Sequence, residues 1–205
     1  MTLWEGRFES APGSILWDYT TDPSDRRLLL DDLDGSIAHV TMLGTTGVIS
    51  AVDSKEIVAG LETIRAEAEQ GKFVFSESDE DVHSAVERRL GELIGAVAGK
   101  LHTARSRNDQ IALDLRLYLR RSATQRIEQL HEFALRLCDL GETAAAVPVP
   151  SYTHLQQAQP STLGHHLLAY AWMALRSVDR FTGSRSRLDV SPLGAGASSG
   201  TSLGI

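Results

Sequence analysis

The sequence predicts an all-α protein, with a small helical amino-terminal domain followed by the long helices of an extended bundle. Apolar residues recur at steps of three or four along several segments, which is the pattern of a helix with one buried face. The stretch from Gln110 to Glu142 has no proline and a single glycine, Gly141. Polar stretches separate the periodic segments, and we place the two domains at residues 1–108 and 109–205.

The amino-terminal domain contains three predicted helices. The first has an apolar stripe over residues 29–43. The second begins with a capping box formed by Asp53 and Glu56. The third carries a stripe over residues 82–97 and follows the acidic run 77–81, whose charge suits the amino terminus of a helix.

Two long helices follow. The one over residues 110–142 would approach about 50 Å in length, and its apolar stripe requires an extended bundle, another chain, or both. Pro148 and Pro150 break it, and a further long helix covers residues 163–183. The segment 191–205 is rich in glycine and serine and has no periodic apolar face, so it reads as a flexible loop or linker.

Composition narrows the class of protein. The chain has 205 residues, of which 42% are hydrophobic, so it can bury a core. Its net charge of −7 argues against binding nucleic acid. The apolar run 167–175 is too short to span a membrane, and residues 1–8 do not resemble a secretory signal, so we expect a cytoplasmic protein. The lone Cys138 cannot form an internal disulfide.

We expect no metal and no cofactor. No pair of histidines has the i, i+4 spacing of a helical zinc site, since His165 and His166 are adjacent and face different directions. No strand precedes a glycine cluster that opens a helix, so a phosphate-binding loop is also absent from the sequence pattern.

The first polar segment, residues 102–110, lies between two strongly periodic helices and has hardly an apolar side chain. It can be a solvated connection in which Asn108 or Asp109 caps the long helix. Alternatively, its hydroxyl, guanidinium and amide donors converge at a helix amino terminus, an arrangement suited to binding a carboxylate.

The second polar segment, residues 150–160, also precedes a long helix and contains His154, which can titrate near neutral pH. A single histidine in a loop is more often structural or solvent-facing than catalytic. Because each polar segment opens a long helix, the two can nevertheless contribute to one cleft between bundle ends.

Five segments, in this order and spacing, resemble argininosuccinate lyase, a family of the fumarase and aspartase superfamily. The two most specific are Ser-Arg-Asn-Asp-Gln at 106–110 and Tyr-Thr-His-Leu-Gln at 152–156. The segments are Leu3–Phe8, Glu80–His83, Gly99–Gln110, Tyr152–Gln156 and Ser191–Ala197.

The resemblance implies a fold and a reaction. Such enzymes cleave argininosuccinate reversibly into arginine and fumarate by β-elimination, without metal or organic cofactor, and work as homotetramers whose active sites draw segments from three chains. The helices after residue 108 would be the first of a fumarase/aspartase-type bundle. The resemblance also implies that family members are more than twice this length, so the bundle is incomplete here. The family's Gly-Ser-Ser-x-Met-Pro-Gln-Lys loop, with the catalytic serine, lies in the part not represented.

The resemblance also assigns roles to individual residues. Ser106, Arg107 and Asn108 match the substrate-binding loop. Thr153 matches a hydroxyl contact to the substrate, and His154 matches the catalytic histidine, as acid or base. Four further residues match positions near the substrate, with helix capping as the alternative for the last two: Thr21, Asp25, Asp81 and His83.

The chain departs from the family at several glycines. Glu5 and Ser151 replace glycines, and either replacement introduces strain if the glycine has positive φ in relatives. Ala104 for a glycine and Gln157 for an arginine look milder.

Because the serine loop is missing, we expect negligible lyase activity from the 205-residue chain alone. Two other functions stay open. One is a catalytically silent structural or ligand-binding relative, as lens crystallins are. The other is a lyase that acts on a different succinyl compound.

Overall fold

The computed structural model describes residues 13–205, and the predicted Leu3–Phe8 segment with Glu5 lies outside them. The predicted all-α class is confirmed, with one small two-stranded sheet in the described part. The elements are α1 (Ser14–Thr20), the 3₁₀ helix η2 (Pro23–Leu28), α2 (Leu29–Thr45), α3 (Ala51–Glu69), α4 (Val82–Ile94), the 3₁₀ helix η3 (Gly95–His102), α5 (Arg107–Thr143), β1 (Pro148–Thr153), β2 (Gln156–Thr162) and α6 (Leu163–Leu188). No helix among residues 13–205 is long and apolar enough to cross a membrane.

The chain divides into two compact units. The first comprises residues up to Tyr118 together with Ser191–Ile205, and the second comprises Leu119–Val190. Helix α5 continues through both units, so a compact unit does not begin where that helix begins. The domain boundary at residue 108 stays a prediction.

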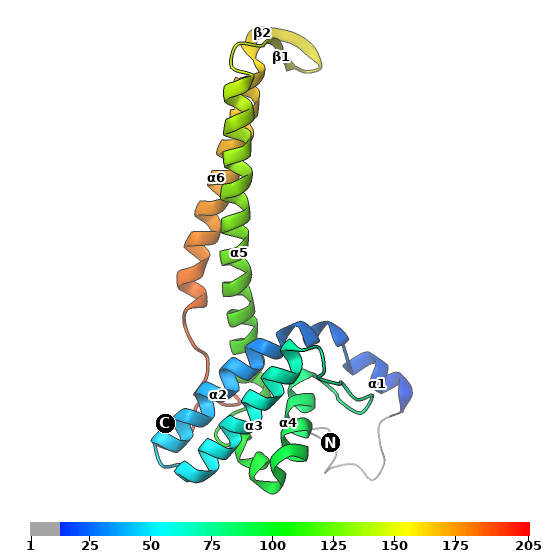
Figure 1. The fold of residues 1–205 in the computed structure, drawn as a ribbon, viewed down its shortest axis with the longest axis vertical. Coiled ribbons are helices and arrows are strands. Elements are labelled where there is room, and N and C mark those ends of the chain that lie inside the picture. The colour runs from blue at the N-terminus through cyan, green and yellow to red at the C-terminus, as the bar shows by residue number, and fades with distance from the viewer. Residues whose placement is uncertain (1–12) are drawn as a thin grey trace. The chain divides into compact units, whose positions relative to one another are not determined.

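In the first unit, α2, α3 and α4 pack against one another, and Figure 1 shows them side by side. Their apolar stripes form one buried core, which includes the fully buried Leu33, Leu43, Ile57, Leu61 and Leu90. Removing each of these side chains from water stabilises the unit by about 2 kcal/mol. The helical spacing of the apolar residues therefore predicted this core.

The cap of α3 corrects the sequence analysis. The N-cap is Ser50, whose side chain accepts from the backbone N–H of Asp53 at 3.1 Å. The Ser50 hydroxyl also donates to the Asp53 carboxylate at 2.6 Å. The capping box predicted for Asp53 and Glu56 is thus wrong, because the helix already begins at Ala51.

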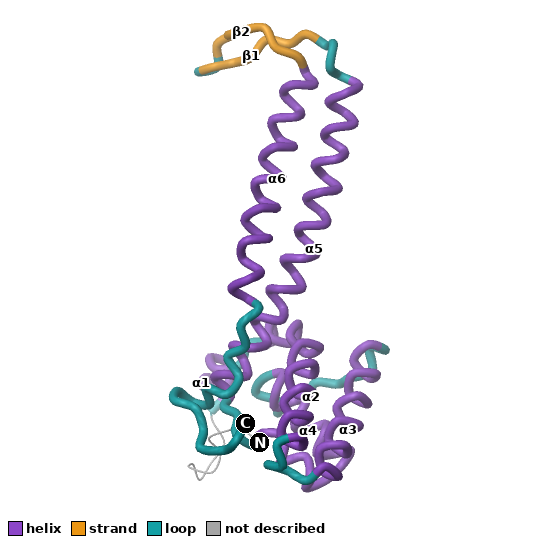
Figure 2. The backbone as a smooth tube through the Cα atoms, turned by 90° about the vertical axis from the view of Figure 1, so that its left-hand side faces the viewer, coloured by secondary structure: helices purple, strands orange, loops and turns teal. Residues whose placement is uncertain are grey.

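In the second unit, the later part of α5 packs against α6, as Figure 2 shows. Small residues hold the two helices close where the hairpin joins them. A Cβ on Gly164 would collide with the carbonyl oxygen of Gly141. Helix α6 passes the predicted end at Gly183 and continues to Leu188.

Strands β1 and β2 form an antiparallel hairpin where the sequence predicted a polar loop. The turn consists of His154 and Leu155, with φ of 50° and 62°, the left-handed conformation that two-residue hairpin turns require. Neither an Asn-Gly pair nor an alternating apolar pattern announces this hairpin in the sequence. The ribbon is mostly solvent-exposed, so its pairing leaves no hydrophobic signature.

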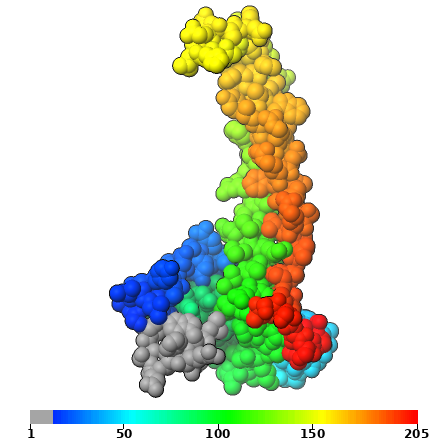
Figure 3. Space-filling view, turned by 180° about the vertical axis from the view of Figure 1, so that it is seen from behind, coloured from blue at the N-terminus to red at the C-terminus, as the bar shows by residue number. Residues whose placement is uncertain are grey.

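The segment Ser191–Ile205 has no helix or strand, as predicted, but it is not a free linker. The backbone N–H of Gly196 donates to the Asp109 carboxylate at 2.7 Å, and the Asn108 side chain donates to the carbonyl of Ala197 at 3.3 Å. Figure 3 shows the carboxyl-terminal segment, in red, beside the green part of the chain in which α5 begins. The prediction missed this packing because the segment contributes only backbone groups to these hydrogen bonds, and backbone groups are the same at every position of a sequence.

Candidate active site

The loop before α5 presents the predicted substrate-binding residues at a helix amino terminus. Helix α5 begins at Arg107, and the Ser106 hydroxyl accepts from the backbone N–H of Asn108 at 3.3 Å. The Asp109 carboxylate accepts from the backbone N–H of Ser106 at 2.9 Å. Ser106 is half-buried and Asn108 is exposed, so both hydroxyl and amide lie within reach of a small molecule. The positive end of the helix dipole favours an anion here.

Buried bonds fix this loop on α2. The Arg105 guanidinium donates to the Ser36 hydroxyl at 2.9 Å, and the His39 ring donates to the Thr103 carbonyl at 2.9 Å. Burial lowers the pKa of both Arg105 and His39. Ala104 has φ of 59°. The replacement that looked mild in the sequence therefore falls in a conformation that costs a non-glycine residue about 1–2 kcal/mol.

Arg107 faces inward and is surrounded by acceptors. Its Nη1 donates to Gln110 Oε1 at 2.7 Å and to Glu87 Oε1 at 3.1 Å, and its Nε lies 3.1 Å from Asp81 Oδ2. Burial acts to raise the pKa of Glu87, but a hydrogen bond from His102 and the charge of Arg107 lower it overall. The guanidinium thus links α5 to α4.

Beneath the loop lies a buried polar cluster that the sequence analysis did not find. It joins Asp32 on α2, His83 on α4 and Gln110 and Asp114 on α5, each at most 2% exposed. Asp32 Oδ1 accepts from His83 Nδ1 at 2.9 Å and from Gln110 Nε2 at 2.6 Å. Asp114 Oδ2 lies 3.4 Å from His83 Nδ1. The predicted site residue His83 is therefore a buried member of this cluster.

The two carboxyl groups of the cluster differ in ionisation. Burial, with the neighbouring charge of Asp32, raises the pKa of Asp114 to about 9. Burial acts in the same direction on Asp32, but the hydrogen bond and charge of His83 prevail and lower its pKa to about 2. Asp32 is thus the anion and Asp114 holds a proton near neutral pH.

Asp32, His83 and Asp114 bring ligand atoms within 4.8 Å of one another, and in the described residues they are the group that can hold a metal ion. The cluster nevertheless suits hydrogen bonding better. Asp32 Oδ1 already accepts from two donors, and the Arg105 charge acts on both carboxyl groups. A cation would have to displace these donors and withstand that positive charge.

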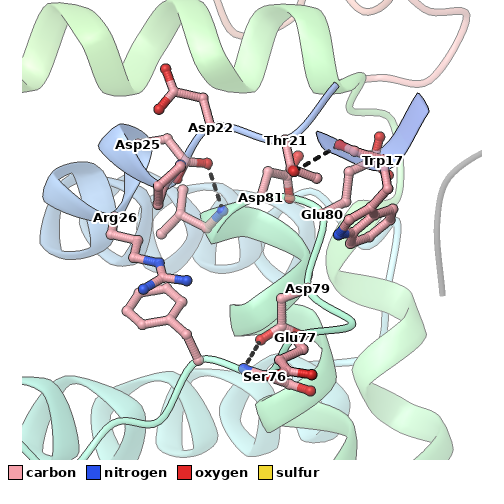
Figure 4. Close-up of a pocket in the computed structure, with 13 residues that line it drawn as sticks. Trp17, Thr21, Asp22, Asp25, Arg26, Ser76, Glu77, Asp79, Glu80 and Asp81 are labelled. Carbon is pink, nitrogen blue, oxygen red and sulfur yellow. Dashed lines mark hydrogen bonds between the residues drawn. The ribbon is translucent and has the colours of Figure 1, made fainter. Parts of the chain in front are cut away.

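A pocket of about 450 Å³ brings three other predicted residues together (Figure 4): Thr21, Asp25 and Asp81. Asp25 accepts from the backbone N–H of Val82 at 2.8 Å, and burial raises its pKa. Thr21 donates to the carbonyl of Trp17 at 2.8 Å. The remaining lining is strongly acidic, with one guanidinium. These charged residues are Asp22, Glu77, Asp79, Glu80 and Arg26.

Asp81 connects the pocket to the loop. It is the N-cap of α4, in a reciprocal capping box with Ser84, which confirms the capping alternative for Asp81 but not for His83, whose side chain bonds to Asp32 instead. Its Oδ2 also reaches Arg107. Capping and lining are therefore compatible roles for one carboxylate.

Thr153 and His154 lie at the tip of the hairpin in the second unit, and both are exposed. Ser151 sits at the register shift between Pro150 and Tyr152, without positive φ, and its hydroxyl donates to the Gln159 carbonyl at 2.7 Å. Serine is therefore tolerated at this position without backbone strain.

The residues that the sequence analysis missed did leave a faint signal. Asp32 falls within the apolar stripe of α2, where a buried acid needs a partner. Gln110 and Asp114 are four positions apart, on one face of α5. A polar residue inside a helical stripe was the observation that could have found them.

Comparisons with known proteins agree with the fold. Residues 6–205 match a family model described as a lyase. An argininosuccinate lyase from Campylobacter curvus (strain 525.92) is 46% identical over 97% of this chain and 43% of its own length. The crystal structure of EDDS lyase in complex with formate has a TM-score of 0.76 and 28% identity, covering 92% of this chain and 37% of that one. An EDDS lyase variant with bound fumarate has a TM-score of 0.76 and 27% identity, covering 96% and 39%.

The helices and the loop at the start of α5 thus define a lyase-type fold of the fumarase and aspartase superfamily. The chain belongs to the lyase family whose model it matches. The resemblance to argininosuccinate lyase is confirmed at the level of sequence. The chain spans about two fifths of the length of the curated relative.

Proposed function

We propose that the chain contributes to an argininosuccinate lyase, which cleaves argininosuccinate reversibly into arginine and fumarate. The observation that carries this proposal is the donor-rich start of α5, where Ser106 and Asn108 are accessible beside an inward-facing Arg107. The 46% identity to an argininosuccinate lyase supports the choice of substrate.

The chemistry accounts for these donors. A base removes a proton from the carbon next to a carboxylate, and the C–N bond then breaks as the guanidino group leaves with a proton. The intermediate carbanion spreads its charge onto that carboxylate, which becomes doubly anionic. Hydroxyl, amide and backbone N–H donors at a helix terminus stabilise this developing charge.

The acidic pocket supports a substrate with a cationic end. Six carboxylates line it beside one guanidinium, Arg26, and two of the six, Asp79 and Asp81, are paired with Arg88 and Arg107 from outside the lining, so the pocket keeps a net negative charge. Such a pocket repels the carboxylates of a succinyl group but attracts a guanidino group. Among succinyl compounds, this charge pattern favours argininosuccinate.

We further propose that His154 acts in a site shared between copies of the chain. The loop precedes α5 and the hairpin follows it, and the 37 residues of that helix extend over about 55 Å. A homotetramer lets a hairpin from one copy meet a loop from another. Exposed apolar side chains on α5 and α6 favour such association. These include Phe133, Leu135, Leu140, Trp172 and Met173.

One alternative has specific support. The likeness to EDDS lyase, a variant of which is seen with bound fumarate, favours a lyase acting on another succinyl compound. We expect a cytoplasmic protein that needs neither metal nor organic cofactor.

The test is a fumarate-release assay with argininosuccinate and, in parallel, other succinyl compounds. We expect the 205-residue chain alone to release no fumarate but to bind it, seen as shifts of the Ser106 and Asn108 amide signals in NMR titration. Turnover by the chain alone would refute the expected inactivity. Shifts confined to residues remote from this loop would refute the proposed site.

A further inference from the structure

We propose that Gln110 is a positioning residue that sets the place of the Arg107 guanidinium by tying it to the buried Asp32. An effect of Gln110 on ligand binding rests on the proposed function, because Arg107 belongs to the predicted substrate-binding loop. The positioning of the Arg107 guanidinium by Gln110 rests only on contacts within the first unit.

The Gln110 side chain uses both ends of its amide. It is 2% exposed, its Nε2 donates to Asp32 Oδ1 at 2.6 Å, and its Oε1 accepts from Arg107 Nη1 at 2.7 Å. Asp32 is in turn held by His83 Nδ1 at 2.9 Å. The guanidinium is therefore connected through two hydrogen bonds to a buried anion that cannot move freely.

Arg107 needs such a tie because carboxylates of α4 compete for it. Glu87 Oε1 lies 3.1 Å from Nη1, and Asp81 Oδ2 lies 3.1 Å from Nε. Both carboxylates are more exposed than the arginine, at 34% and 21% against 11%. Without the glutamine, α4 would draw the guanidinium toward itself, and an incoming carboxylate would meet it in another orientation.

The amide is the group that this position requires. A glutamate would keep an acceptor for Arg107 but would present an anionic oxygen to Asp32, where an N–H now lies 2.6 Å away. A methionine has similar length and volume but makes neither bond. Gln110→Glu therefore keeps a bond to the guanidinium but changes its position, whereas Gln110→Met removes the bond altogether.

The experiment measures the Arg107 side-chain Nε–H signal by NMR in the 205-residue chain. In Gln110→Met we expect its exchange with water to accelerate about tenfold, because a guanidinium that loses hydrogen bonds becomes mobile. In Gln110→Glu we expect slow exchange to persist while the chemical shift moves, because the group is held but displaced. If the methionine variant does not fold, the Arg107 chemical shift in Gln110→Glu decides whether Gln110 positions the guanidinium.

A matched control exists on the second unit. Arg126 donates to Gln129 Oε1 at 2.6 Å on an exposed surface, so Gln129→Met removes the same kind of pair away from the loop. It should leave the Arg107 signal unchanged. An Arg107 signal that is unaltered in both Gln110 variants, or altered equally by the control, would overturn the proposal.

Fumarate titration tests whether the hydrogen bonds of Gln110 to Arg107 and Asp32 affect ligand binding. We expect each Gln110 variant to weaken fumarate binding at least threefold, measured at a temperature at which circular dichroism shows the variant to be folded. If the unaltered chain binds no fumarate, the proposed function fails for this chain, whereas the Arg107 signal still decides whether Gln110 positions the guanidinium.

Discussion

Substituting Asp114 by asparagine should stabilise the protein, and more so as the pH rises. The folded state holds this carboxyl group with a pKa of about 9, against 3.8 in an unfolded chain. Between these values the folded protein keeps a proton that the unfolded chain has lost. The free energy of unfolding therefore falls as pH rises across this window, by about 1.4 kcal/mol per pH unit.

Asparagine has nearly the same shape and does not titrate, so Asp114→Asn removes this penalty. Because the side chain is 1% exposed, solvent screens the effect little. Across the three pH units from pH 5 to pH 8, the difference in free energy of unfolding between variant and parent should grow by about 4 kcal/mol. Asp32 does not contribute to this slope, since its pKa of about 2 gives stability that is lost only below about pH 4.

Urea unfolding, followed by circular dichroism at both pH values, measures the difference. Asp34→Asn is the matched control, because it makes the same chemical change at an exposed carboxylate, which is paired with Arg65. A variant-to-parent difference that is equal at pH 5 and pH 8 would show that Asp114 is ionised in the folded protein and would refute the assignment.

Three further predictions concern stability and are checked by the same unfolding measurements. Ala104→Gly should raise the free energy of unfolding by about 1 kcal/mol, because glycine adopts positive φ without strain; an unchanged midpoint would contradict this. Gly164→Ala should lower it by more than about 2 kcal/mol, because the new Cβ would collide with the Gly141 carbonyl, whereas Gly183→Ala, with open space around it, should be neutral or raise it by up to about 1 kcal/mol. Asp32→Ala should lower it by about 3 kcal/mol, since it leaves two buried donors unpaired; a loss below about 1 kcal/mol would mean that these donors find other partners.

Helix content and the apolar core were predictable because both depend on local spacing. The stripe over residues 29–43 appears in the structure as α2, with Leu33, Val40 and Leu43 fully buried. The stripe over residues 110–142 appears as α5 with a few more residues at its start. Such periodic patterns are local properties of the sequence, so they can be recognised without knowing which segments pack against them.

Contacts between distant segments were not predictable. The hairpin pairing of Thr153 with Gln156 has no apolar alternation to announce it. The bond from Gly196 to Asp109 joins a backbone group to a side chain 87 positions away, and nothing in the spacing of either segment predicts the other. The glycine-rich composition predicted a free tail, although two hydrogen bonds join it to the start of α5.

The sequence by itself determined that this chain is helical, where most helices lie, and which family it resembles, because periodicity and short motifs are local properties. Only the tertiary structure decided which polar residues meet. It placed Asp32, His83 and Gln110 from three helices in one buried cluster, and it set the ionisation of Asp114. Those properties depend on burial and on distances between helices, and the order of residues along a chain does not encode them in any locally readable form.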